Sequence, residues 1–152
     1  MIFNKIKMSI RDLKAYEQVL FNGLYKLDAN ENSFDLPETI KNIIAKEAKK
    51  IEYNRYPDPY SNRLKELISK KLKINKNNLI IGNGSDEIIY YLLLSFIENG
   101  DNVIVPHPTF EMYKILSQIC GATVIEVPLD DHFDLDGEKI IKIMKDKKVK
   151  FI

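Results

Sequence analysis

The sequence predicts an α/β fold in which a mostly parallel sheet is covered by helices on both faces. Short apolar segments at 79–81, 103–105, 123–127 and 149–152 alternate with helical segments from Asn78 onward. Strands that are buried on both faces are typically continuous apolar runs, and parallel strands need crossover helices between them. An apolar fraction of 45% in 152 residues is enough for a sizeable core.

Composition excludes several classes of protein. The 23 Lys and Arg nearly balance the 22 Asp and Glu, so no broad charge favours nucleic acid or an anionic membrane. No apolar run reaches the roughly 18 residues of a membrane span, and Lys and Asn interrupt the first residues too often for a signal peptide. The single Cys120 excludes an internal disulfide, and with two histidines it cannot form a structural zinc site. We expect a soluble, cytoplasmic chain without a metal.

The first half is predicted to be helical. Ser9 can cap a short helix that runs through Tyr16. After Pro37, isoleucines recur at helical spacing as far as Ile51, and a second amphipathic helix should follow a cap at Ser61. Between them, the two prolines of segment 53–59 exclude helix and fix an extended turn.

The second half alternates strands with helices. Prolines at 106 and 128 should end two of the strands, and glycines at 100 and 121 should close two of the helices. The last strand stops where a loop and a helix are expected to follow, so we infer that the chain is a fragment. The expected helices are 85–99, 110–119 and 136–147.

The segment Gly-Asn-Gly-Ser-Asp-Glu at 82–87 joins a predicted strand directly to a helix. Gly82 and Gly84 allow unusual backbone angles and close approach of a ligand. The unpaired N–H groups of the first helical turn lie at the positive end of the helix dipole, which suits a phosphate. The segment matches neither the dinucleotide fingerprint nor the P-loop. Taken alone, the segment favours an ordinary helix start, with Ser85 as the cap and the two acids complementing the dipole, because capped helices far outnumber phosphate sites.

Three further segments contain candidate site residues. The segment 106–113 follows a strand and therefore lies at the carboxyl edge of the sheet, where Phe110 opens a helix and can cover a flat cofactor. His107, between two prolines, is a rigid loop residue rather than a base. The proline-fixed loop 55–59 can present a tyrosine to a distant site, and 28–32 is dense in carboxylates and amides. Taken alone, these segments favour core packing for 106–113, an exposed turn for 55–59 and a solvated loop for 28–32.

The order of four segments resembles histidinol-phosphate aminotransferases, a family of fold-type-I, pyridoxal-phosphate-dependent enzymes. The segments are Lys-Leu-Asp-Ala-Asn-Glu-Asn at 26–32, Arg-Tyr-Pro-Asp-Pro at 55–59, Gly-Asn-Gly-Ser-Asp-Glu at 82–87 and Pro-Thr-Phe-Glu-Met-Tyr at 108–113. The likeness runs from Ile10 to the last residue. It implies a three-layer αβα fold with the mostly parallel sheet of the family's large domain, incomplete in this chain.

The resemblance also implies roles around pyridoxal 5′-phosphate. The backbone of Gly84, Ser85 and Asp86 would bind the cofactor phosphate. Phe110 would stack on the pyridine ring, and Tyr56 would reach across a homodimer interface to the phosphate in the partner's site.

On the substrate side, the segment 11–16 is similar to the family's Arg-x-Leu-x-Pro-Tyr, with Ala15 in place of proline. Its Tyr16 would contact the substrate phosphate, and Asn30 would lie near the amino-acid end. Segment 33–37 departs from the family's usual pattern, and the connection between Tyr16 and Lys26 is short.

By this resemblance, residues 1–27 form an arm, 28–74 contribute small-domain and dimer-interface helices, and 75–152 begin the cofactor-binding domain. The implied reaction transfers an amino group between L-histidinol phosphate and 2-oxoglutarate in histidine biosynthesis. The Schiff-base lysine, the acid at the pyridine nitrogen and the carboxylate-binding arginine would all follow Ile152, so no catalytic residue is assigned here. Alternatives are a sibling enzyme, such as threonine-phosphate decarboxylase or another aminotransferase, and a non-catalytic phosphate-binding or assembly module.

Overall fold

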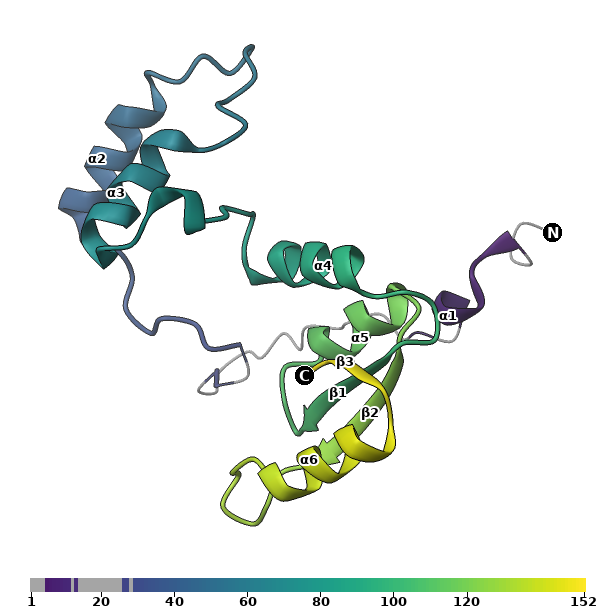
Figure 1. Cartoon of the computed structure of the whole chain (residues 1–152). Helices are drawn as coiled ribbons and strands as arrows, with labels where there is room; N and C mark the ends of the chain where they lie inside the picture. Colours follow the sequence, from purple (N-terminus) through teal and green to yellow (C-terminus); the bar gives the residue numbers. More distant parts are fainter. Residues whose placement is uncertain (1–4, 12, 14–25, 28) are drawn as a thin grey trace. The chain divides into compact units, whose positions relative to one another are not determined.

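The computed structural model describes residues 5–11, 13, 26–27 and 29–152 (Figure 1). The chain divides into two compact units. The first contains residues 1–14 and 65–152, and the second contains residues 15–64. The first unit holds the sheet and the helices that pack on it, and therefore the segment 82–87 that the sequence marks as an anion site.

The sheet has three strands, β1 (Asn102–His107), β2 (Thr123–Pro128) and β3 (Val149–Phe151), in the order β2-β1-β3. Both neighbours run parallel to β1, and Asn102 is opposite Thr123 on one side and Val149 on the other. The predicted parallel sheet is therefore confirmed. All three carboxyl ends lie at one edge of the sheet, where ligands bind in α/β folds.

The core lies on both faces of the central strand. Val103 and Val105 pack with Leu93 of helix α4 (Ser85–Phe96) and Leu116 of helix α5 (Met112–Ile119). The alternate residue, Ile104, is only 1% exposed and packs on the opposite face with Val127 and Ile140.

Helix α6 (Gly137–Asp146) supplies Ile140, so helices cover both faces of the sheet, and Figure 1 shows α5 and α6 on opposite sides. This arrangement confirms the three-layer expectation. The Asp136 side chain caps α6 by accepting a hydrogen bond of 2.9 Å from the Lys139 N–H. Gly121, with φ of +90°, closes α5 as predicted.

Two expectations for the second half are wrong. Segment 79–81 is not a strand: it follows a 3₁₀ turn (Lys76–Asn78), and Ile80 is 74% exposed. A strand needs a neighbour for its backbone hydrogen bonds, and none of the three described strands pairs with 79–81. Helix α4 ends at Phe96 instead of Asn99 because Ile97 turns to extended backbone and buries its side chain in the core.

Smaller differences concern the ends of other elements. Strand β1 continues through Pro106 to His107, and α5 begins at Met112 after Glu111, so Phe110 precedes the helix. Near the amino terminus, helix α1 (Met8–Arg11) contains Ser9 within it, so Ser9 is not its cap. The rest of the predicted helix, through Tyr16, lies largely outside the described residues.

Helices α2 (Glu38–Ala48) and α3 (Asn62–Leu72) match the predicted amphipathic pair. Ser61 does not cap α3, since it has φ of +48°. The Asp58 carboxylate takes that role by accepting hydrogen bonds from the Asn62 N–H at 2.7 Å and the Tyr60 N–H at 3.0 Å. Within the part of the chain that the structure describes, no helix combines the length and apolar character needed to cross a bilayer.

We expect the 152-residue chain alone to self-associate. No described residue between 26 and 64 is buried, and large apolar side chains such as Ile80, Leu94 and Ile141 are more than half exposed. Contiguous exposed apolar surface favours association. Sedimentation analysis over a concentration series should show oligomers or aggregates. A monomer that melts sharply and cooperatively in dilute solution would contradict this expectation.

Candidate functional site

A cavity of about 450 Å³ lies between α4, residues 103–106 of β1 and the start of α5. Thr109 and Tyr113 contribute to its wall from the loop after β1 and from α5, and Ile89 contributes from α4. The remaining walls are mostly aliphatic or aromatic. A flat, mostly apolar ring is the kind of ligand that such a wall accommodates. The cavity lies within the first unit and extends along β1 from Val103 to Thr109, which follows the carboxyl end of that strand. Neither Phe110 nor residues 84–86 line it.

Helix α4 begins without a side-chain cap. Its cap residue is Gly84, with φ of +86° and ψ of 176°, a backbone region almost exclusive to glycine. Ser85 is the first helical residue, so the expectation that Ser85 caps the helix is wrong. The N–H groups of the first helical turn have no acceptor within the helix, and no capping side chain accepts a hydrogen bond from them.

The space around the Gly84 Cα is open, because an added Cβ there would meet no atom within 4 Å. Gly84, Ser85 and Asp86 are all exposed. Open space, uncapped N–H donors and the positive end of the helix dipole together fit a phosphate group.

Glu87 interacts with the loop before α4. Its carboxylate accepts hydrogen bonds from the Asn83 N–H and, at 3.1 Å, from the Tyr91 hydroxyl. The hydrogen bond and the negative charge of Glu87 raise the pKa of Tyr91 above its ordinary value. The sequence predicted only a dipole-complementing role for Glu87, although an acid at the third helical position is a known signal for side-chain contact with the preceding loop.

Phe110 lies in the loop between β1 and α5, in the sequence between Thr109 and Glu111. Its ring meets the Tyr113 ring edge-on, with centroids 5.9 Å apart and an interplanar angle of 89°. The Phe110 side chain is 43% exposed. The Phe110 ring therefore packs against a neighbouring ring. The residues before and after it in the sequence, Thr109 and Glu111, each line a cavity of the first unit.

The remaining predicted residues belong to the second unit or lie outside the described residues. Tyr56 is fully exposed, at 101%, in the turn between α2 and α3. Asn30 is exposed and has φ of +50°, which asparagine tolerates better than most residues. Tyr16 lies outside the described residues. Residues 84–86 thus lie together at the start of α4, and Phe110 belongs to the same unit. Tyr56 and Asn30 belong to the second unit.

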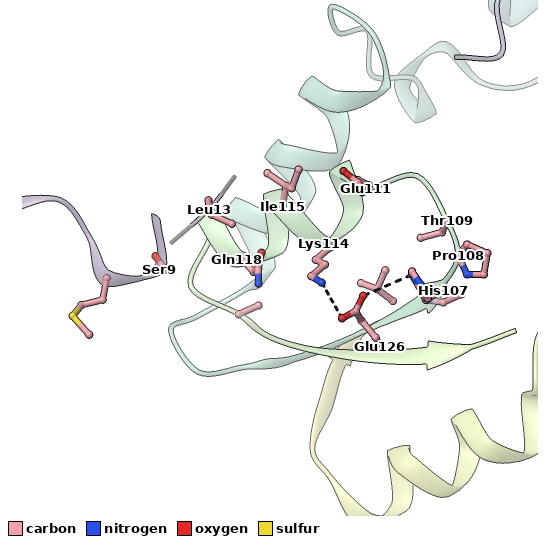
Figure 2. A pocket seen from close by; sticks show the side chains of 14 residues that line it. Ser9, Leu13, His107, Pro108, Thr109, Glu111, Lys114, Ile115, Gln118 and Glu126 are labelled. Carbon is pink, nitrogen blue, oxygen red and sulfur yellow. Dashed lines mark hydrogen bonds and ion pairs between the residues drawn. The ribbon is translucent and has the colours of Figure 1, made fainter. Parts of the chain in front are cut away.

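Sequence reasoning missed a charged cluster in a second cavity, of about 760 Å³ (Figure 2). The Glu126 carboxylate of β2 lies 2.9 Å from Lys114 Nζ of α5 and 3.8 Å from His107 Nδ1, the latter an ion pair only when the imidazole is protonated. His107 ends β1 and is not a loop residue. The sequence signal that could have indicated this cluster is Glu126, the acid inside the mostly apolar segment 123–127. Lys114 neutralises Glu126, and among the described residues no His, Cys, Asp and Glu group could hold a metal ion.

Comparison with known proteins agrees with this geometry. The profile of the family "Aminotransferase class I and II" matches residues 22–152. The chain is 38% identical over 152 residues to a histidinol-phosphate aminotransferase of Caldanaerobacter subterraneus subsp. tengcongensis. That alignment covers all of this chain but 43% of the relative, so the chain spans less than half the length of that protein.

Two solved structures share the fold. A histidinol-phosphate aminotransferase from Sinorhizobium meliloti in complex with pyridoxal-5′-phosphate aligns with a TM-score of 0.71 at 21% identity, over 80% of this chain and 32% of that one. An aromatic aminotransferase from Pyrococcus horikoshii aligns with a TM-score of 0.67 at 26% identity, over 80% of this chain and 34% of that one. The fold is therefore that of the aminotransferases. Since the family profile matches from residue 22 to the last residue, this chain belongs to the class I and II aminotransferase family.

Proposed function

We propose that this chain is the amino-terminal portion of a pyridoxal-phosphate-dependent aminotransferase that moves an amino group between L-histidinol phosphate and 2-oxoglutarate. The substrate assignment is supported by 38% identity to a histidinol-phosphate aminotransferase along the whole chain. In this proposal the protein acts in histidine biosynthesis in the cytoplasm, and the rest of the enzyme follows Ile152. Residues 75–152, which contain all three described strands, begin its cofactor-binding domain, 28–74 contribute small-domain and interface helices, and 1–27 form an arm.

The observation that carries the proposal is the uncapped start of α4. The N–H groups that follow Gly84 are free of side-chain caps, and no atom would approach a Cβ at that position within 4 Å. A dianionic phosphate is the ligand class that such a helix start binds best. The residues present therefore fit the phosphate of pyridoxal 5′-phosphate.

Within this proposal, the backbone of Gly84, Ser85 and Asp86 binds the cofactor phosphate, and Phe110 presents its ring face to the pyridine ring. When bound, the cofactor supplies an electron sink for the carbon–hydrogen bond that breaks at the amino-acid α-carbon. The described residues bind and orient it. In this proposal, the lysine that would bind the cofactor covalently and transfer the proton belongs to the part of the enzyme after Ile152.

Tyr56 is proposed to reach the cofactor phosphate of a partner subunit in a homodimer. Its full exposure, at 101%, leaves the hydroxyl available, and Pro57 and Pro59 stiffen the turn that carries it. Tyr16 is proposed to contact the substrate phosphate, and Asn30 to lie near the amino-acid end of the substrate. Both substrate roles rest on the match of their segments to the family pattern.

The complete enzyme that begins with this chain should transaminate L-histidinol phosphate with 2-oxoglutarate. The same preparation should be assayed with L-aspartate, L-phenylalanine and L-threonine phosphate, since siblings of this fold act on other amino acids. We expect kcat/KM for L-histidinol phosphate to exceed that for L-aspartate and L-phenylalanine by at least about a hundredfold, because buried partners of a substrate polar group reject analogues that lack it. It should also exceed the value for L-threonine phosphate, which has a phosphate but no imidazole. A higher value for any alternative would reassign the substrate.

Gly84→Val should weaken retention of pyridoxal 5′-phosphate in the complete enzyme by at least about tenfold. Valine strains a backbone with φ of +86° and ψ of 176° and thereby displaces the N–H groups that bind phosphate. The measurement is the dissociation constant, followed through the cofactor's absorption.

Gly100→Val is the matched control. Gly100 also has positive φ, +88°, and open space around its Cα, but it lies in the loop before β1, at the opposite edge of the sheet from His107. It should leave the dissociation constant unchanged within about twofold, since its strain of roughly 1–3 kcal/mol acts away from the site. Equal effects of the two substitutions would remove the phosphate assignment.

Tyr56→Phe should raise the cofactor dissociation constant about ten- to a hundredfold, the loss of one hydrogen bond to a charged group. Tyr60→Phe, in the same turn and 68% exposed, removes an equivalent hydroxyl and should have no effect. If Tyr56→Phe retains the cofactor as well as the unmodified enzyme does, the cross-subunit role of Tyr56 is wrong.

A further inference from the structure

We propose that Glu87 is a positioning residue, whose carboxylate holds the loop 82–84 so that the first-turn N–H groups of α4 stay open to the cofactor phosphate. This inference rests on the proposed function, because it assigns a supporting residue to the same site. It concerns a side chain that faces the loop and does not itself contact the phosphate.

The hydrogen-bond pattern at the start of α4 differs from an ordinary capping box. Ser85 is the first helical residue, so Glu87 occupies the third helical position. In a capping box, an acid at this position binds the N–H of the cap residue. Here the Glu87 carboxylate binds one residue further back, at the Asn83 N–H, and so does not consume the N–H of Gly84. The loop is fixed while the donors nearest the open space remain unoccupied.

Both oxygens of the Glu87 carboxylate are used. Oε2 accepts from the Asn83 N–H, and Oε1 accepts from the Tyr91 hydroxyl, which lies one helical turn further along α4, at 3.1 Å. The hydrogen bond to Glu87 raises the pKa of Tyr91, as expected of a neutral phenol that donates to a carboxylate. Tyr91 therefore restricts the rotation of the Glu87 side chain and supports its contact with the loop.

The loop packs closely over this side chain at Gly82. A Cβ added to Gly82 would lie 2.9 Å from Glu87 Oε2 and 2.6 Å from Ile88 Cδ1. The half-buried Glu87 side chain thus occupies the space that any larger residue at 82 would need. Glu87 Oε2 can therefore reach the Asn83 N–H only because residue 82 has no side chain.

The role assigned to Glu87 is geometric rather than electrostatic. A negative charge close to a phosphate opposes binding, so the benefit of Glu87 must come from the loop that it holds. Glutamine can make the same contacts without the charge: its amide oxygen can accept from the Asn83 N–H, and its amide nitrogen can donate to the Tyr91 oxygen. Alanine can make neither contact. Glu87→Gln therefore separates position from charge.

The test uses the complete enzyme and measures dissociation constants for pyridoxal 5′-phosphate and for pyridoxal, which lacks the phosphate. Glu87→Ala should weaken binding of pyridoxal 5′-phosphate about tenfold and that of pyridoxal less than about twofold, since only phosphate binding depends on the held loop. Glu87→Gln should restore binding to within about twofold of the unmodified enzyme. The matched control is Glu138→Ala, which removes an acid from the first turn of α6 and should change neither constant.

Unaltered pyridoxal 5′-phosphate binding by Glu87→Ala would overturn the positioning role while leaving the proposed function intact. A loss in Glu87→Gln equal to that in Glu87→Ala would also overturn it, because charge would then be the cause. If Glu87→Ala fails to fold, Tyr91→Phe provides the test: it should weaken phosphate-dependent binding about threefold, and no change would overturn the proposal. Failure of the unmodified enzyme to bind pyridoxal 5′-phosphate would instead refute the proposed function.

Discussion

The arrangement of the first unit depends on the burial of β1 on both faces. Val103 and Val105 face α4 and α5, and Ile104 faces α6, so three consecutive residues tie both helical layers to one strand. The parallel strand β2 pairs with β1 from Asn102 to His107, and β3 pairs with its first two residues, so much of the β1 backbone is hydrogen-bonded inside this apolar environment. The same constraint fixes where the strands end, and so brings the loop containing Phe110 to the carboxyl edge of the sheet.

Local signals in the sequence predict this unit well. The apolar run at 103–105 and Gly121 after α5 each act through neighbouring residues, and each has the predicted role. Asp136 was expected to be the first helical residue and is instead the cap of α6. The signals that failed depend on distant partners. Segment 79–81 has the composition of a strand but has no described strand beside it, and Ile97 leaves the helix because a core position is available to it. Hydrophobic periodicity contains no information about either partner.

In the candidate site, too, features set by neighbouring residues could be predicted and those set by distant partners could not. A glycine before a helix indicated the anion site at Gly84, and the structure adds the reason, a backbone conformation that only glycine adopts readily. Ser85 was expected to be the cap from its residue type, but the helix begins one residue earlier than a serine cap requires. The pairing of Lys114 with Glu126 could not be predicted, because it joins α5 to β2 through the geometry of the sheet.

The two glycines of the loop before α4 meet different requirements. Gly84 stands in open space and is needed for its backbone angles, whereas Gly82 is needed because Glu87 and Ile88 fill the volume beside it. An acid so near a phosphate site is unfavourable by charge alone. It becomes useful when both carboxylate oxygens are directed at the loop and at Tyr91, since the helix start then keeps its N–H donors and its shape. A phosphate-binding helix start can therefore include a carboxylate, provided that the carboxylate forms its hydrogen bonds with the loop and does not face the phosphate.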